Sequence, residues 1–153
     1  MRIALGSDHA GYDLKSSLVK NLTEWGHEVV DLGPGNGTDS VDYPDFGEAV
    51  GLCVTSGKAD MGIAVCGSGI GISIAANKVP GIRAALVHDA TSARLAREHN
   101  HANVLCLGAR LIGEPVALDA VQAWLGATPA EGRHIGRIDK LSALDQRLTP
   151  PER

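Results

Sequence analysis

The chain of 153 residues has few aromatic side chains, few cysteines and no large excess of either charge. Aromatic residues make up 3% of the sequence, and 14 basic against 18 acidic side chains give a formal net charge of -4 at pH 7. A surface that neutralises nucleic-acid phosphates or anionic lipid headgroups needs a positive excess, which this sequence lacks. We therefore expect neither nucleic acid nor a membrane among its partners.

Cysteine occurs only at Cys53, Cys66 and Cys106, and no two of these form a C-x-x-C pair. That spacing argues against a disulfide framework and against a thiolate zinc site. The sequence also has no apolar run of membrane-spanning length and opens without a secretory signal pattern. These absences predict a cytoplasmic protein.

Short apolar runs, by contrast, are abundant, and they alternate with longer segments in which apolar residues recur every three or four positions. Strict alternation of this kind predicts parallel strands joined by right-handed helical crossovers. We therefore expect a single domain, residues 1–153, with a doubly wound α/β fold around a five-stranded parallel sheet. The predicted strands are 2–6, 27–32, 62–66, 83–87 and 104–108, and the predicted helices are 14–25, 44–56, 71–78, 90–99 and 114–125.

Residues 131–148 form a tail with more apolar residues at helical spacing than a free tail carries. We predict a C-terminal helix that packs on a partner subunit or back on its own domain. The apolar positions are Ile135, Ile138, Leu141, Leu144 and Leu148.

Polar residues follow four of the five predicted strands. In an open parallel sheet, ligands bind beyond the carboxyl ends of the strands, so an acid, an imidazole, a thiol and a guanidinium can meet at this edge. The residues are Ser7, Asp8 and His9 after the first strand, Cys66 to Gly69 after the third, His88 and Asp89 after the fourth, and Gly108 to Arg110 after the fifth.

The loop Cys66-Gly67-Ser68-Gly69-Ile70-Gly71 leads from a predicted strand into a predicted helix, where backbone N–H groups can bind an anion. It matches neither nucleotide motif, because Ile72 replaces the last glycine of G-x-G-x-x-G and Ala76 replaces the second glycine of a P-loop. An oxyanion or phosphate site is therefore predicted. Tight packing of small residues is the structural alternative.

Cys66 heads this loop, and N–H donors at a helix start favour the thiolate, the form that takes up a proton. Cys53 in an apolar helical segment and Cys106 within a strand are typical of small buried hydrophobic residues. We therefore predict that Cys66 is the catalytic base.

His99 ends a predicted helix, where the helix dipole favours a protonated imidazole suited to acid–base chemistry. A solvent-exposed capping histidine is the alternative. His99 and His101 lack the additional carboxylate or histidine ligands of a metal site, so we predict no metal.

Arg133 and Arg137 are four residues apart, so on a helical tail they share one face and can clamp a phosphate with bidentate contacts. The competing interpretation is a solvated basic face that pairs with Glu131 or Asp139.

Four motifs follow one another along the chain: Gly6-Ser7-Asp8-His9-Ala10-Gly11, the 66–71 loop, His99-Asn100, and Arg133-His134-Ile135-Gly136-Arg137. Together they resemble the ribose-5-phosphate isomerase B family, which also includes galactose-6-phosphate isomerase subunits. The resemblance spans nearly the whole chain and implies a Rossmann-like three-layer αβα sandwich. It also implies a homodimer or a dimer of dimers, with the active site in a cleft between subunits and the 131–148 helix on the neighbour.

The resemblance implies conversion of ribose 5-phosphate to ribulose 5-phosphate through an enediolate, without cofactor or metal. Isomerisation of an allose, galactose or tetrose phosphate, a metal-dependent hydride shift, and a non-catalytic sugar-phosphate or nucleotide binding module are the alternatives. Some family members use a glutamate after the glycine loop as base, but Ile72 stands there. The resemblance implies that Cys66 is the base and that Asp8 and His99 open the sugar ring, with His99 and Asn100 contributed by the other subunit. It implies enediolate binding by Gly67, Ser68, Gly69 and Gly71, and phosphate binding by His9, Arg133 and Arg137. Further substrate contacts are implied for Tyr43 and Arg110.

Overall fold

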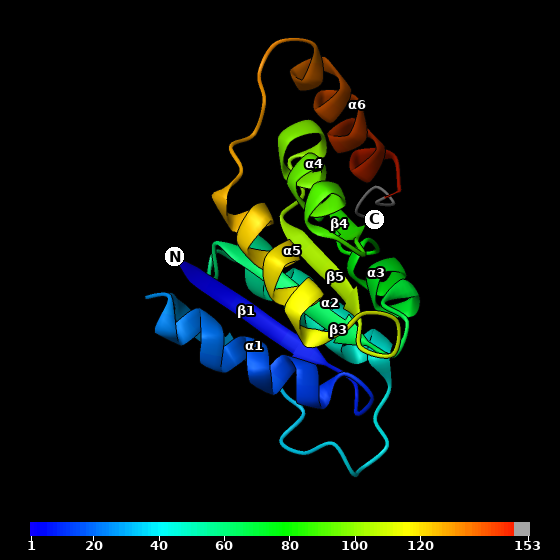
Figure 1. The fold of residues 1–153 in the computed structure, drawn as a ribbon. Coiled ribbons are helices and arrows are strands. Elements are labelled where there is room, and N and C mark those ends of the chain that lie inside the picture. The colour runs from blue at the N-terminus through cyan, green and yellow to red at the C-terminus, as the bar shows by residue number, and fades with distance from the viewer. Residues whose placement is uncertain (149–153) are drawn as a thin grey trace.

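Five strands form one parallel sheet in the order β2-β1-β3-β5-β4, and helices cover both of its faces (Figure 1). This arrangement comes from a computed structural model that describes residues 1–148. The predicted Rossmann-like three-layer αβα sandwich is confirmed. None of the helices in the described residues is both long and apolar enough to cross a membrane.

Every predicted strand and helix is present, with bounds within two residues of the expectation. Pro44 and Pro115 stand in the first turns of two helices, where the missing proline N–H costs no hydrogen bond. The strands are β1 (Arg2–Ser7), β2 (Glu28–Asp31), β3 (Met61–Cys66), β4 (Ala84–Leu86) and β5 (Val104–Gly108). The helices are α1 (Tyr12–Glu24), α2 (Tyr43–Thr55), α3 (Ile70–Ala76), α4 (Ala90–Asn100), α5 (Glu114–Gly126) and α6 (Arg133–Leu148).

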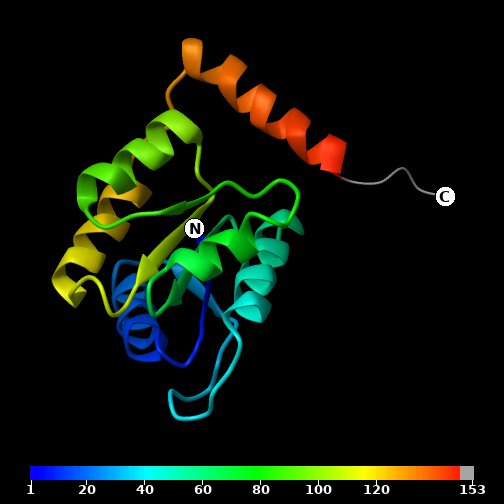
Figure 2. The ribbon, with the colours of Figure 1, turned by 90° about the vertical axis from the view of Figure 1, so that its right-hand side faces the viewer.

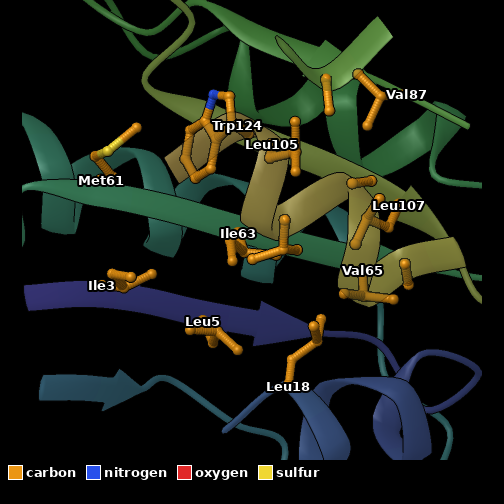
Figure 3. Packing of buried hydrophobic residues seen from close by; sticks show 14 of the residues in the cluster. Ile3, Leu5, Leu18, Met61, Ile63, Val65, Val87, Leu105, Leu107 and Trp124 are labelled. Atoms are coloured by element: carbon orange, nitrogen blue, oxygen red, sulfur yellow. The ribbon is translucent and has the colours of Figure 1, made fainter. Parts of the chain in front are cut away.

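Large apolar side chains fill the space between the sheet and the helices α1, α4 and α5 (Figure 3). Trp124 of α5 is fully buried there, and its indole nitrogen donates to the carbonyl of Ala102 at 3.2 Å. Leu14, Leu18 and Leu22 recur at helical spacing on α1 and are buried against the same face. In this half of the core, large side chains of complementary shape fill the space at the packing density that is usual for protein interiors.

The opposite face of the sheet carries small residues, and α2 and α3 approach it closely. A Cβ atom on Gly62 of β3 would lie 2.5 Å from Val50 of α2, and one on Gly6 would lie 2.9 Å from the same side chain. On α2 itself, a Cβ atom on Gly47 would meet α3 at 2.8 Å. Glycine is therefore what permits this close packing of helix on sheet and helix on helix.

Helix α6 lies outside the sandwich, alongside α4 (Figures 1 and 2). The segment before it is tied to the end of α4, because the N–H of Ala130 donates to the carbonyl of Glu98 and His101 bonds the carbonyl of Ala130. Ile138 of α6 is buried. Ile135, Leu141 and Leu144 remain exposed, so this helix leaves apolar surface uncovered within one chain.

Candidate active site

The neighbouring strands β1 and β3 end side by side at the carboxyl edge of the sheet. The chain leaves β1 for β2 on one side and enters β3 on the other, which makes this pair the switch point where α/β sheets bind ligands. Ser7 pairs with Val65, and the N–H of Asp8 donates to the carbonyl of Val65 at 3.1 Å. Asp8 is therefore held next to Cys66, the last residue of β3.

A cavity of about 330 Å³ opens at this point, and we call it the Cys66 cavity. It brings together an acid, a thiol, a hydroxyl, a phenol and a guanidinium from four separate places in the sequence. All but one of its lining residues were predicted as site residues, and Leu111 is the addition. The lining residues are Asp8, Tyr43, Cys66, Gly67, Ser68, Gly71, Arg110 and Leu111.

The Cys66 side chain is 4% exposed, and its sulfur accepts a hydrogen bond from the N–H of Gly69 at 3.1 Å. Gly69 has φ of 77°, and a Cβ atom there would lie 2.5 Å from Leu86 and 2.8 Å from the backbone of Leu107. The hydroxyl of Ser68 accepts from the N–H of Ile70 at 3.2 Å and can still donate. The loop thus turns tightly around the thiol and gives it an N–H donor.

Asp8 is 8% exposed, and one of its carboxylate oxygens accepts from the N–H of Gly11 at 2.9 Å. That bond fixes the carboxylate at the cavity wall. Two glycines set the opposite walls, because a Cβ atom on Gly67 would meet the Arg110 guanidinium at 3.3 Å and one on Gly71 would meet the Tyr43 ring at 2.6 Å. The cavity is therefore shaped by close contacts to backbone.

Three other polar residues of this edge lie outside the Cys66 cavity. Nδ1 of His9 lies within hydrogen-bond distance of the Val41 backbone, 3.2 Å from its nitrogen and 3.3 Å from its carbonyl oxygen. Asp89 caps α4 instead of facing the cavity, because its side chain accepts from the N–H of Ser92 at 2.6 Å, and these Ser92 bonds lower the pKa of its carboxyl. His88 precedes it at the same helix start, so the expectation that these two join the thiol is wrong.

The remaining cysteines are buried and free. Burial raises the pKa of the Cys106 thiol far above its ordinary value, and the nearby Cys66 adds to the effect. Cys53 on α2 and Cys106 on β5 both belong to the part of the core between the sheet and the helices α2 and α3. The prediction that they are structural residues is confirmed.

A second cavity, of about 470 Å³, lies between the end of α4 and α6, and we call it the arginine cavity. Within the described residues, neither Arg133 nor Arg137 forms an ion pair with Glu131 or Asp139, the pairing of the competing interpretation. Two positive charges thus face the cavity without a carboxylate partner. Its lining residues are His99, Asn100, Arg133, His134, Arg137, Ile138 and Leu141.

His134 is a residue of this cavity that the sequence analysis did not assign. Its ring stacks on that of His99, with centroids 4.6 Å apart and planes inclined by 10°. Partial burial of the ring lowers the pKa of His134, and the charges of His99, Arg133 and Arg137 lower it further. The sequence feature that could have identified His134 as a site residue is its position between the two arginines of the 133–137 motif.

One chain does not bring the two cavities together, and they share no lining residue. Helix α4 starts at Ala90, beyond the carboxyl end of β4, and runs back along the sheet for 11 residues. At 1.5 Å per residue, the helix carries the chain roughly 14 Å from Ala90 to His99, toward the opposite edge of the sheet. His99 therefore sits far from the Cys66 of its own chain.

Comparison with known proteins gives a consistent result. The family described as Ribose/Galactose Isomerase matches residues 3–141. Ribose-5-phosphate isomerase B of Escherichia coli (strain K12) is 46% identical over 146 residues, which cover 95% of this chain and 97% of the relative.

Solved structures agree with this match. Ribose-5-phosphate isomerase B of Clostridium thermocellum superposes with a TM-score of 0.95 at 50% identity, covering 97% of this chain and all of the other. The Mycoplasma genitalium enzyme with bound ribulose-5-phosphate gives a TM-score of 0.91 at 41% identity, covering 97% of both chains. With the family match over residues 3–141 and relatives that align with nearly the whole chain, the chain belongs to the Ribose/Galactose Isomerase family.

Proposed function

We propose that this chain interconverts ribose 5-phosphate and ribulose 5-phosphate by proton transfer. The observation that carries the proposal is the Cys66 sulfur, which lies in a cavity at the sheet switch point beside Asp8 and receives the N–H of Gly69. The relatives named ribose-5-phosphate isomerase B, one of them with ribulose-5-phosphate bound, support the choice of substrate.

The proposed chemistry begins with opening of the sugar ring, for which Asp8 and His99 exchange protons with the ring oxygen and the anomeric hydroxyl. The Cys66 thiolate then removes the proton from C2 of the open aldose, and the electron pair moves to form an enediolate. Within the enediolate, the proton of the C2 hydroxyl passes to the oxygen on C1, and the Cys66 thiol then returns a proton to C1, which gives the ketose and restores the thiolate. The same steps in reverse convert ketose to aldose.

The enediolate needs hydrogen-bond donors that are not already used inside the loop. Gly69 donates to the Cys66 sulfur and Ile70 donates to Ser68. We assign the N–H groups of Gly67 and Ser68 to the developing oxyanion, together with the Ser68 hydroxyl. Arg110 and Tyr43 line the same cavity and bind the sugar hydroxyls in this proposal.

The phosphate goes to the arginine cavity, where Arg133 and Arg137 supply guanidinium donors and His99 and Asn100 lie adjacent. Because His99 lies far from the Cys66 of its own chain, we propose that each site combines the Cys66 cavity of one subunit with the arginine cavity of another. A two-fold homodimer makes two such sites with one kind of interface. The exposed apolar residues of α6 give the second subunit a surface to cover.

The function is tested by assaying the purified protein on ribose 5-phosphate, allose 6-phosphate, galactose 6-phosphate and a tetrose phosphate. The pentose phosphate is expected to give the highest kcat/KM. Carrying out the reaction in deuterium oxide distinguishes proton transfer, which places solvent deuterium in the product, from a hydride shift, which does not. A chain that binds ribose 5-phosphate without turnover would be a binding module instead.

The shared site is tested by mixing two inactive variants, Cys66→Ala and His99→Asn, through joint refolding. If each site uses both subunits, mixed dimers regain one intact site, and equal mixing restores about a quarter of wild-type activity. Cys66→Ala mixed with Asp8→Asn is the matched control, since both residues lie on the same edge of one chain and no site is restored. Equal behaviour of the two mixtures would refute the shared site.

A further inference from the structure

Lys15 carries a charged side chain that is almost completely buried, although it lies on α1 at the surface layer of the fold (residue 1% exposed). Its ammonium bonds Asp31 at 2.6 Å and the carbonyl of Pro34 at 3.1 Å, and lies 5.4 Å from the centre of the Tyr12 ring. A buried ammonium is costly unless such partners surround it. Lys15 therefore ties α1 to the segment that follows β2.

That segment, the 33–42 loop, is the glycine-rich stretch that runs from the end of β2 to the start of α2 beside the carboxyl end of β1 (Figure 1). Its near end is fixed to β1, because the carbonyl of Gly33 accepts from the N–H of Ser7 at 3.1 Å. The N–H of Gly33 also donates to the same Asp31 oxygen that Lys15 binds. Lys15 and Asp31 thus set where the loop leaves the sheet.

The far end of the loop reaches His9, next to Asp8 of the Cys66 cavity. Nδ1 of His9 lies 3.2 Å from the nitrogen and 3.3 Å from the carbonyl oxygen of Val41, so the Val41 backbone can hold this nitrogen in either tautomer. In the tautomer in which Nδ1 accepts from the Val41 N–H, the ring proton is on Nε2. Nε2 has no hydrogen-bond partner among the described residues, so its N–H can donate to an anionic ligand.

We propose that Lys15 is a positioning residue for the isomerase reaction, acting through the 33–42 loop on His9. By fixing the start of the loop, Lys15 and Asp31 place the backbone of Val41, which holds the His9 ring in the orientation that presents Nε2 to the sugar phosphate. This inference rests on the proposed function for the role of His9 as a ligand of substrate. Tyr43, the first residue of α2, follows the same loop into the Cys66 cavity.

A double-mutant cycle tests the proposal. Lys15→Met is expected to raise KM for ribose 5-phosphate about tenfold while kcat changes by less than about twofold, since a misaligned donor weakens binding of substrate and transition state alike. In a His9→Ala background the same change is expected to add nothing to KM. Additive effects of the two substitutions, or an unchanged KM in Lys15→Met, would overturn the proposal. Lys20→Met, an exposed lysine on the same helix, is the matched control and should match wild type.

Asp31→Asn keeps the test decisive if Lys15→Met does not fold, because the Asp31 side chain is 46% exposed and the substitution leaves Lys15 in place. It should raise KM in the same direction by a smaller factor and also be non-additive with His9→Ala. Nitrogen chemical shifts of His9 give a readout that needs no turnover: the Nδ1 shift of the wild type should change in the Lys15 and Asp31 variants, because the Val41 backbone no longer holds that nitrogen in place. An unchanged Nδ1 shift would refute the positioning role even if the protein isomerises another sugar.

Discussion

The Cys66 cavity and the arginine cavity differ in what holds their side chains in place. The first is built at the ends of two buried strands, with glycines pressed against Tyr43 and Arg110. The second lies between the end of α4 and a peripheral helix whose apolar residues are mostly exposed. In the proposed mechanism, chemistry that needs accurate geometry takes place at the sheet, and charge-based binding takes place at a peripheral helix that a second subunit would cover. Four experiments test whether the two cavities differ in this way.

The largest expected effect is a loss of kcat from a substitution in the Cys66 cavity. Cys66→Ala should lower kcat for ribose 5-phosphate about a thousandfold with little change in KM, because a general base acts in the transition state. Steady-state kinetics checks this, and Cys53→Ala, another buried cysteine in the same half of the core, should keep wild-type kcat. Near wild-type turnover in Cys66→Ala would remove the thiol from the mechanism.

Gly69→Ala should destabilise the fold by about 3 kcal/mol, combining left-handed backbone strain with overpacking against Leu86 and Leu107. Gly26→Ala is the matched control: Gly26 also has positive φ, 87°, but a Cβ atom there meets nothing within 4 Å. It should therefore cost only the strain, about 1 kcal/mol. Denaturant unfolding measures both. Equal losses would show that the Cys66 loop is not tightly packed.

Neutralising the arginine cavity should affect binding more than turnover. Arg133→Gln and Arg137→Gln are each expected to raise KM about tenfold, with kcat and stability nearly unchanged. Arg94→Gln, which removes an exposed ion pair with Glu98 on α4, is the control and should leave KM as it is. If the double variant at positions 133 and 137 kept wild-type KM, the basic face would be only solvated.

The smallest effect concerns pH. Because the folded protein lowers the pKa of His134 from 6.5, the unfolded chain binds more protons near and below that pH. The folded state is therefore disfavoured as pH falls through about 6.5, and His134→Gln should remove that part of the pH dependence. Unfolding of both proteins at about pH 5.5 and about pH 7.5 checks the sign. Proton NMR should also show the pKa of His134 rising when inorganic phosphate is added, since an anion offsets the neighbouring positive charges.

Sequence reasoning predicted the sheet side well, because its features are local. Alternating strands and helices determine a parallel sheet, and a cysteine followed by glycines at a strand end determines where the thiol lies. It failed where distant segments meet. The stacking of His134 on His99 depends on how α6 approaches α4, and the buried ammonium of Lys15 depends on a loop that follows the next strand.

Asp89 shows a different limit. Its position after β4 suggested a role at the edge of the sheet, but the same position is the N-cap of α4. An aspartate directly after a strand can either line a cavity or cap the following helix, and the direction of its side chain determines which of the two it does. The wrong expectation for Asp89 and the confirmed position of Asp8 in the cavity wall came from the same rule.

The glycines that let α2 approach the sheet have a consequence for how this protein can change. A larger side chain at Gly62 or Gly6 would push Val50 outward and carry α2 with it, and Tyr43 stands at the first turn of that helix. Mutations that look purely structural therefore alter the wall of the Cys66 cavity. Substrate preference in such a molecule can drift through substitutions in the core, well before any residue that touches the sugar is replaced.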